Sequence, residues 1–512
     1  MKTPGVYIVD KPAFANAVVE VPTAVTAFIG YTETALCAGK SLYRRPTRIN
    51  SMSEFVQYFG VAPQPLFDVT TAGPTDDNTF VVNTKHYQLR QVAGMYQLYY
   101  AMMLFYQNGG GPCYIVSVGS YTDAVTSTAL ISAIDLLINE QEPTLLLIPD
   151  AILLDEDDCI AVQQAALHHC GGKMGNRMAI LDIWQGYQPR QHPQGDCIAN
   201  FRRKLGTGYL DFACAYYPWL NTNIMQQHLL SYKNLTPAAQ LQQVLKQQLN
   251  LPDVPPGQAS ATEKAVSLEQ QKLSVIADIS ADCSGLENTE RLAKEKLLHT
   301  SLTANSPLYN QLLSQMCSIV NLQPPAAAMA GIFTQVDSAR GVWQAPANVG
   351  LSAVVSPAVN ISHDEQQDLT DSYDGKSVNA IRAFPGAGTL VWGARTLDAN
   401  SLDWRYINVR RSMIMLQESI RLALKAYVFE SNSANTWLST NSMLSHFLSG
   451  IWQRGGLAGA SADDAFSVSV GLGETMTEDD IRSGVLRVTV LVALSRPAEF
   501  INITLEQQMQ KT

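Results

Sequence analysis

The chain has 512 residues, of which 46% are hydrophobic and 16% charged, and its formal net charge is −10. This length allows roughly three domains of ~100–200 residues, each with a sizeable core. The negative charge disfavours a general nucleic-acid binder, and the low proportion of charged residues is more typical of a subunit of a large assembly than of a free monomer.

Membrane and secretion signals are not recognisable in the sequence. No run reaches the ~18 consecutive apolar residues of a membrane span, so we expect no membrane insertion. The first residues, MKTPGVYIVD, lack the apolar core and cleavage site of a secretory signal, which predicts synthesis and folding in the cytoplasm. In that compartment the eight cysteines, none in a CxxC pair, are expected to be reduced and mostly buried.

Short apolar runs begin the chain. Residues 6–9 predict a terminal strand, which stays ordered only if a sheet holds it. Residues 26–30 predict a second strand. Ser51 or Ser53 is then a suitable cap for a helix that ends at Gly60.

The middle of the chain predicts an α/β arrangement. A buried helix over residues 94–107 precedes a strand over 113–118. Continuous apolar runs at 144–150, 177–184 and 213–217 are typical of buried parallel strands, and helical patterns separate them. Strands that alternate with helices predict βαβ units and a mostly parallel or mixed sheet.

Three features of this region suggest chemistry, but each has a plainer interpretation. Asp150 and Asp182 lie near strand ends, where catalytic groups gather in α/β sheets; no partner constellation follows, which favours a turn residue or a helix cap. The His-His-Cys run at 168–170 would diverge by ~100° per residue on a helix, so a helix end stabilised by histidine is favoured over a metal site. The glycines at 109–111 lack the Lys-Ser/Thr of a P-loop. We therefore predict no catalytic residue, cofactor or metal site.

Residues 222–307 differ in composition from the rest, because Gln, Ser, Ala, Lys and Glu dominate them. Patterns at 238–249 and 264–276 predict exposed helices. We interpret the segment as an insertion that is flexible or decorates the outer surface.

The C-terminal part predicts two helices followed by a hairpin. Residues 411–430 combine an apolar stripe with a basic stripe that contains Arg411, Arg421 and Lys425. A second helix is expected over about 436–454. Runs at 466–472 and 485–494 alternate apolar with polar residues and predict a β-hairpin. Its apolar positions include Val468, Val470, Val488, Val490 and Val492.

A further strand pattern follows at residues 499–505. Pro497 lies between it and the hairpin, and because proline has no N–H to donate to a ladder, this last strand need not pair with the strand before it. A well-patterned strand that is separated from its own hairpin can complete the sheet of another copy.

Motif-like stretches run in order along the whole chain: PGVY at 4–7, MAILDIW at 178–184, CAYYPWL at 214–220, MAGIFTQVDSARGVWQAPANVGL at 329–351, TLVWGARTL at 389–397, WRYINVRR at 404–411, IWQRG at 451–455 and RPAEFINITL at 496–505. Together they resemble the tail sheath protein family of contractile phages and phage-like contractile injection systems. The resemblance is closer to the extracellular injection-particle and R-type-tail branch than to the two-protein sheath of type VI secretion, because both terminal parts lie on one chain. Residues 222–307 match no part of it.

The resemblance implies a structural protein without a cofactor, a catalytic site or direct contact with nucleic acid. Family sheaths stack as hexameric rings around an inner tube, with baseplate and terminator or cap proteins as further partners, and contraction drives the tube through a target envelope. Assembly takes place in the cytoplasm, and the phage tail or phage-tail-like particle is then released. Each subunit donates two strands to neighbours, an N-terminal one (Val6, Tyr7, Ile8 and Val9) and a C-terminal one (Phe500, Ile501, Asn502, Ile503 and Leu505).

The resemblance also implies a multidomain α/β and α+β organisation. Residues 1–20 and 496–512 are the expected arms, and 21–90 belong to a tube-proximal α+β sheath domain. Residues 91–330 form the outer middle α/β domain that carries the insertion, and 331–495 form the C-terminal sheath core.

Several functional interpretations stay open at this point. The hairpin is expected to accept donated strands. The cations Arg411, Arg421 and Lys425 are candidate contacts to an acidic tube surface, with a solvated helix face or a contact within the sheath as the alternative. The whole chain could instead be a sheath-like paralogue or adaptor ring at the baseplate or cap, or, remotely, an enzyme that uses Asp150 or Asp182.

Overall fold

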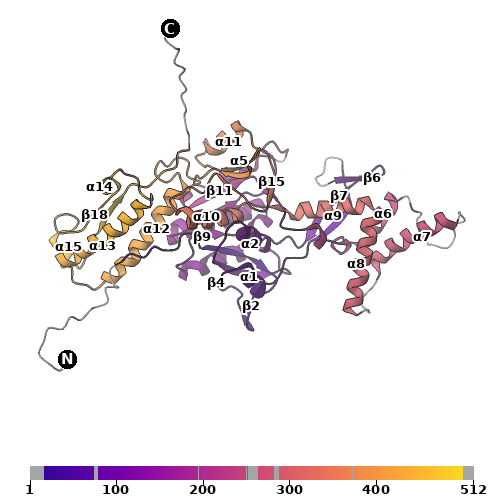
Figure 1. Cartoon of the computed structure of the whole chain (residues 1–512), viewed down its shortest axis with the longest axis horizontal. Helices are drawn as coiled ribbons and strands as arrows, with labels where there is room; N and C mark the ends of the chain where they lie inside the picture. The colour runs from indigo at the N-terminus through magenta and orange to yellow at the C-terminus, as the bar shows by residue number, and fades with distance from the viewer. Residues whose placement is uncertain are drawn as a thin grey trace, which may run out of the picture.

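The computed structural model describes residues 17–73, 79–193, 195–249, 251, 263–281, 287–371 and 373–499, without the side chains of 263–269. The molecule is elongated and has three parts (Figure 1). A central body holds the largest sheet, an outer end carries the insertion, and a C-terminal unit lies at the opposite end of the long axis.

A mixed sheet of nine strands forms the central body, in the order β14-β17-β16-β11-β10-β9-β1-β8-β4. The strands from β16 to β8 are parallel to their neighbours, and antiparallel strands close both edges. The sheet therefore has the predicted mixed character. Its strands are β1 (Thr26–Thr32), β4 (Thr47–Ile49), β8 (Cys113–Ser120), β9 (Leu145–Leu147), β10 (Met178–Asp182), β11 (Ala213–Tyr217), β14 (Val349–Gly350), β16 (Asn379–Phe384) and β17 (Gly388–Trp392).

Helices cover both faces of this sheet and bury a core on each side. Alternate residues of a strand face opposite sides, so Phe28 joins one core while Ala27 and Ile29 join the other. The first core packs against α2 (Leu98–Gln107) and α10 (Ala326–Arg340). The second packs against α3 (Ser127–Ile134), α4 (Glu156–Leu167) and α5 (Cys197–Lys204).

Local sequence signals explain several element ends. The Ser51 side chain accepts a hydrogen bond from the Glu54 N–H and caps α1 (Met52–Phe59), and Gly60 ends that helix with φ 87°, as predicted. Residues 109–111 form the plain turn between α2 and β8 that their sequence indicated. Small elements complete the body: β2 (Leu36–Cys37), β3 (Lys40–Ser41), β12 (Leu220–Thr222), β13 (Leu322–Gln323), β15 (Val354–Pro357) and α11 (His363–Thr370).

The outer end combines a small antiparallel sheet with the insertion. The sheet has the order β5-β7-β6, formed by β5 (Leu66–Thr71), β6 (Thr79–Val82) and β7 (Lys85–Ala93). The helices are α6 (Ala238–Gln248), α7 (Glu263–Ala277), α8 (Asn288–Asn305) and α9 (Pro307–Val320), at the end opposite the C-terminal unit in Figure 1.

Two expectations about these segments need correction. The helix at 238–248 is not merely an exposed decoration, because Leu241, Val244 and Leu245 are buried and Tyr87 donates a hydrogen bond from its hydroxyl to Gln247 Oε1 at 2.8 Å. Residues 21–90 do not form one domain either. Strands β1 and β4 lie in the central sheet, whereas β5 to β7 pack with the insertion, since their apolar faces are covered there.

The C-terminal unit has its own small core. It contains α12 (Ile407–Leu424), α13 (Ala434–Gln453), α14 (Ala462–Ala465), α15 (Glu478–Arg482) and the hairpin of β18 (Phe466–Ser469) and β19 (Thr489–Val492). Leu416, Leu448 and Ile451 are buried between these elements. Helix α12 begins before and ends before the predicted 411–430, so the C-terminal end of that prediction lies in a turn and a loop.

Residues from the N-terminal side of the chain also enter this core. Val18 and Val21 pack against the same cluster as Val490 and Val492. The C-terminal unit is therefore built from both sides of the sequence.

Two further properties follow from the described residues. None of the helices in this part of the chain is long and apolar enough to cross a membrane. The described cysteines are unpaired, and burial raises the pKa of buried thiols such as Cys113 and Cys159 to about 12, so these side chains are inert core residues.

Candidate assembly site at the chain ends

The hairpin of the C-terminal unit has one open edge. Strands β18 and β19 form a two-stranded sheet in which Val468 lies opposite Val490. The outer edge of β18 faces α13, where Asn441 Nδ2 donates to the Val468 carbonyl at 2.7 Å. No other strand of the described residues is paired with β19, so its outer edge presents backbone groups to which a further strand can add.

The predicted hairpin is confirmed as an element, with a shorter ladder than expected. Val468, Val490 and Val492 lie in its strands and pack on the small core. Val470 follows the end of β18, and Val488 precedes β19, so both lie outside the ladder. That the hairpin accepts a donated strand stays a prediction.

Both predicted donor strands lie outside the described residues. The structure describes the segment next to each, which we call the N-terminal root (residues 17–23) and the C-terminal root (residues 495–499). These roots determine where each arm leaves the subunit.

A buried ion pair holds the N-terminal root. Both carboxylate oxygens of Asp337 in α10 accept hydrogen bonds from Arg411 in α12, at 2.9 and 2.5 Å. The side chains of Arg411 and Asp337 are 4% and 5% exposed. Thr23 bonds to both partners, because its hydroxyl donates to Asp337 at 2.6 Å and its carbonyl accepts from Arg411 at 2.8 Å. The Val21 N–H donates to Ser419 Oγ at 3.1 Å, so the root lies along α12.

This geometry corrects the interpretation of Arg411 as an exposed cation. Its guanidinium faces inward, 4.7 Å from the ring centre of Phe333, and is bonded to Asp337 and Thr23. An arginine held in this way cannot also form a separable surface contact. The sequence periodicity placed Arg411 on a polar stripe, but the periodicity of one helix carries no information about a partner on another helix, α10.

A second buried arginine holds the C-terminal root. Arg395 follows β17 and is 3% exposed. Its Nε and Nη2 bind the Glu499 carboxylate at 2.9 and 2.7 Å, and its Nη1 binds Asp371 at 2.7 Å and the Thr370 carbonyl at 3.1 Å. Burial alone would lower the pKa of Arg395, but the hydrogen bonds to Glu499 and Asp371 outweigh it and raise the pKa. The arginine is therefore charged and fully engaged.

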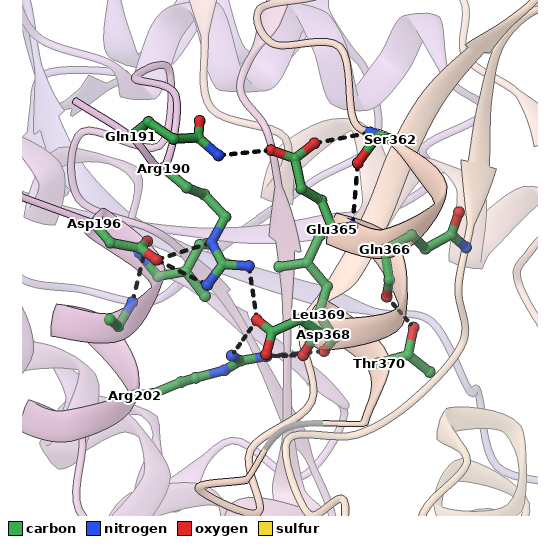
Figure 2. A network of polar contacts seen from close by, with 12 residues as sticks. Arg190, Gln191, Asp196, Arg202, Ser362, Glu365, Gln366, Asp368, Leu369 and Thr370 are labelled. Atoms are coloured by element: carbon green, nitrogen blue, oxygen red, sulfur yellow. Dashed lines mark hydrogen bonds and ion pairs between the residues drawn. The ribbon is translucent and has the colours of Figure 1, made fainter.

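The end of α11 connects this root to a larger polar network (Figure 2). Figure 2 shows Asp368 of α11 between two arginines, with Arg190 at 2.7 Å and Arg202 at 3.2 Å. Although burial acts in the opposite direction, these guanidiniums lower the pKa of Asp368. Arg202 also donates to the Asp368 and Leu369 carbonyls at 2.8 and 3.1 Å. Arginines thus satisfy the last carbonyls of the helix, where its dipole favours cations.

The two acidic candidates at the strand ends have structural roles. Asp150 is fully buried and accepts the Tyr31 N–H at 2.7 Å and the Gln97 N–H, at the start of α2, at 2.6 Å. A Cβ at Gly30 would lie 2.4 Å from its Oδ2, so the close approach requires glycine. Asp182 accepts the Ala326 N–H at 2.9 Å, at the start of α10.

Neither acid has the surroundings of a catalytic group. Burial raises the pKa of Asp150 to about 6 and that of Asp182 to about 7, with backbone hydrogen bonds opposing the shift in both. The cavity beside Asp182 is about 20 Å³, which leaves room for about one water molecule. The helix-cap interpretation therefore holds for both residues, and the remote enzyme alternative loses its candidates.

The His-His-Cys run has a different environment from the one expected. Residues His168–Met174 form a π-helical turn, and His169 is buried with its Nε2 3.2 Å from Arg177 Nη1. Burial and the Arg177 charge lower the pKa of His169 to about 4, so its ring is neutral at pH 7. The idea of a cationic histidine at a helix end is wrong for this residue. Within the described ranges no group of three His, Cys, Asp or Glu side chains is placed to hold a metal ion.

Comparisons with known proteins agree on one family. Residues 399–508 match the family described as the phage tail sheath C-terminal domain. The tail sheath protein of Vibrio phage KVP40 is 27% identical over 135 residues, which are 26% of this chain and 20% of that protein. The match to this relative thus spans about a fifth of its length.

Solved structures are similar over nearly the whole chain. The anti-feeding prophage helical sheath in its contracted state is 25% identical, with 99% of this chain and 100% of that chain covered and a TM-score of 0.58. The sixfold-symmetrised anti-feeding prophage baseplate is 25% identical, with 99% of this chain and 100% of that chain covered and a TM-score of 0.57. The sheath complex of an extracellular contractile injection system, PVC, was solved in its contracted state. It is 24% identical, with 99% of this chain and 98% of that chain covered and a TM-score of 0.58.

The sequence match at residues 399–508 and the similarity of fold over nearly the whole chain both point to the contractile tail sheath proteins. The similar solved proteins are the sheath complex of an extracellular contractile injection system and a helical sheath, both in the contracted state. The mixed α/β multidomain fold expected from the resemblance is the fold of these sheath proteins.

The other two cations of the predicted basic stripe, Arg421 in α12 and Lys425 directly after it, differ in how far their charge is free to bind a partner. Arg421 is 45% exposed and binds Glu418 at 2.6 Å, so part of its charge is balanced within the helix. This hydrogen bond raises the pKa of Arg421. Lys425 is exposed at the end of α12 and forms no ion pair with the described residues. Contact of these two side chains with a tube stays a prediction.

Sequence reasoning missed the residues that hold the roots. Asp337, Arg395 and Glu499 lie within quoted stretches, at QVDS, WGAR and PAEF, but no role was assigned to them. The available signal was a charged residue inside a largely apolar motif. That signal cannot identify partners 74 or 104 residues away along the chain.

The pH dependence of stability should change when Asp182 is made neutral. Its pKa of about 7 in the folded protein exceeds the ordinary aspartate value of 3.8, so the folded state holds the proton more tightly. The resulting contribution to stability is complete below about pH 4 and is lost as the pH rises toward 7. Asp182→Asn keeps an acceptor for Ala326, and we expect it to remove a loss on the order of a few kcal/mol.

Urea denaturation at about pH 5 and about pH 7.5 measures this difference. The exposed carboxyl of Asp463 provides the matched control, because Asp463→Asn changes no buried group. If the unfolding free energy of Asp182→Asn differs between the two pH values by as much as that of the wild type, Asp182 is not the buried group that titrates.

The two arginines of α12 should differ in their effect on stability. Arg411→Gln leaves Asp337 as a buried carboxylate without its cation, which costs about 3–5 kcal/mol of unfolding free energy. Arg421→Gln breaks an exposed pair and should change it by less than about 1 kcal/mol. Chemical denaturation of the two variants beside the wild type measures both effects, and equal values would refute the inward orientation of Arg411.

Proposed function

We propose that this sheath protein polymerises as stacked hexameric rings around an inner tube, and that exchanged N- and C-terminal strands link its subunits. Contraction of the sheath then drives the tube through a target envelope. The observation that carries the proposal is the open edge of β19 together with two chain roots that are both bonded to α12.

Strand donation fits the physics of that edge. An added strand satisfies the backbone N–H and C=O groups of β19, and alternate side chains of the arm can pack on the hairpin. Leu491, on the face of the hairpin away from the core, is 64% exposed and offers apolar surface to a neighbouring copy. Asn408 Nδ2 of α12 donates to the Ser495 carbonyl at 3.1 Å and guides the chain out of the hairpin.

Contraction needs no bound nucleotide in this proposal. A sheath assembled in a metastable lattice releases free energy when its subunits reach a better-packed one. The similar anti-feeding prophage sheath was solved in a contracted state, which supports such a transition for this chain.

The partners follow from the same assignment. They are other copies of the chain, an inner tube protein, and baseplate and terminator or cap proteins, with no nucleic acid bound directly. The similar baseplate structure was solved with sixfold symmetry, which supports hexameric rings. Assembly in the cytoplasm and release as part of a phage-tail-like extracellular particle complete the proposal.

A specialised ring at the baseplate or cap is the second candidate. It is favoured by the likeness to a baseplate structure, which equals the likeness to the helical sheath in coverage and identity. Electron microscopy of the purified protein separates the two. Long hollow cylinders support the sheath, whereas single rings support the adaptor.

Removal of either arm should prevent long sheaths without unfolding the subunit. Deletion of residues 1–11, or of everything after Ser495, leaves the three cores and the hairpin intact. We expect folded subunits by circular dichroism and only short oligomers by sedimentation and electron microscopy. Cylinders of normal length from either truncation would reject strand exchange.

Charge reversal on α12 should affect assembly on the tube but not empty sheaths. Arg421→Glu with Lys425→Glu changes two exposed side chains at the end of that helix. We expect sheaths that form alone but co-sediment poorly with tubes, because exposed charge pairs are weak individually and lost on reversal. Reversal of Arg482, which is 72% exposed on α15, is the control. Unchanged binding to tubes would exclude Arg421 and Lys425 from the interface.

A further inference from the structure

One side chain connects the last described residues to the body of the subunit. Glu499 directly precedes the predicted donor strand, and its carboxylate is bound bidentately by the buried Arg395. Tyr406, at the start of α12, adds a third donor from its hydroxyl to Glu499 Oε2 at 3.1 Å. Glu499 is therefore held by two residues that lie side by side, because Arg395 and Tyr406 pair in an isolated antiparallel bridge.

Arg395 is itself rigidly placed. Its backbone N–H donates to Asn379 Oδ1 at 2.7 Å, and its carbonyl accepts from Asn379 Nδ2 at 2.7 Å. Its Nη1 is committed to the end of α11 through Thr370 and Asp371. A planar guanidinium with its donors committed in this way presents the remaining Nε and Nη2 in one direction only. The position of Glu499 is thus determined by the central body.

The other ion pair of the root is weak by comparison. Arg496 lies 3.5 Å from Asp403, and the two side chains are 54% and 78% exposed. An exposed pair of this geometry contributes little, because water and salt screen it. Within the described part of the root, Glu499 supplies the strong contact.

We propose that Glu499 is a positioning residue whose ion pair with Arg395 sets the point and direction from which the C-terminal arm leaves the subunit toward a second copy of this chain. The inference rests on the proposed strand exchange. Fixing the residue before the donor strand lowers the entropy that the arm loses when it pairs with a neighbour.

The network of Figure 2 gives this contact a fixed base. Arg202 and Arg395 bind successive carbonyls at the end of α11, and Asp368 joins Arg202 to Arg190. The arm is therefore anchored to the central body, whereas the hairpin with the open edge belongs to the C-terminal unit. A subunit can then hold its donated arm in place while its hairpin receives the arm of another.

The test compares three full-length variants with the wild type. Glu499→Gln removes the charge of the anchor with little change of shape. Asp403→Asn removes the exposed partner of Arg496 in the same root, and Asp463→Asn removes an exposed carboxyl of α14 that takes no part in the contacts of the root. Unassembled subunits are treated with chymotrypsin, and mass spectrometry follows cleavage after Phe500, because a protease needs several free residues on each side of the bond.

We expect cleavage after Phe500 to be at least about tenfold faster in Glu499→Gln, and within about twofold of the wild type in both control variants. Sedimentation and electron microscopy measure the protein concentration at which assembly begins. We expect this concentration to be about tenfold higher for Glu499→Gln than for the wild type, and unchanged for the control variants. Wild-type cleavage in Glu499→Gln would overturn the anchor. Faster cleavage with normal assembly would overturn its positioning role.

The truncation after Ser495 separates this proposal from the proposed function. If the truncated protein fails to assemble while Glu499→Gln assembles normally, strand exchange stands and the positioning role falls. If the truncated protein assembles normally, strand exchange falls and with it the positioning role, whatever the cleavage rates.

Discussion

The arrangement of the chain ends depends on one buried ion pair, Arg411 with Asp337. It joins α12 to α10 and holds Thr23, so that residues 388 positions apart in the sequence meet. A buried pair is not by itself a large source of net stability, because desolvation offsets much of the attraction. The pair instead favours one path of the N-terminal root over others. On any other path the Thr23 hydroxyl and carbonyl would lose their hydrogen bonds to Asp337 and Arg411. Arg395 and Glu499 repeat the same device at the other root, with Asp371 and the end of α11 as the additional partners.

The central sheet shows why an α/β body with acids at its strand ends need not be catalytic. Asp150 and Asp182 lie at the carboxyl ends of strands, where active sites are common. Each is bonded to the first N–H groups of a helix. Asp150 is fully buried, and the cavity beside Asp182 is too small for a substrate. Their raised pKa values result from burial and not from a partner acid or base. A perturbed carboxyl marks a functional site only when it faces a cavity with other polar groups.

The parts of the fold that could be predicted are those with a local cause. The run at 213–217 is a strand because five apolar residues in sequence are buried on both faces, and Ser51 and Gly60 mark both ends of α1. The parts that could not be predicted depend on contacts between distant segments. Nothing in residues 26–49 indicates that they share a sheet with 379–392. Periodicity placed Arg411 on a polar stripe, but only Asp337 on another helix determines that it is buried. The predicted hairpin, helices and family rested on local pattern or ordered motifs, whereas the root contacts join distant segments and can be seen only in the folded structure.

The distribution of strong and weak contacts suits a protein that must change its neighbours without unfolding. Inside the subunit, the arginines at both roots are 3–4% exposed and bidentate. At the surface, Arg421, Arg482 and Arg496 are 45%, 72% and 54% exposed, in pairs that water screens. A lattice rearrangement that breaks only contacts of the second kind leaves the subunit and its arms intact. Because backbone pairing along an open edge is much stronger than one exposed ion pair, the proposed exchanged strands would persist through contraction while side-chain contacts between subunits are replaced. Rigid roots are what such a mechanism requires, since a linkage transmits motion only if both of its ends are fixed to the bodies that move.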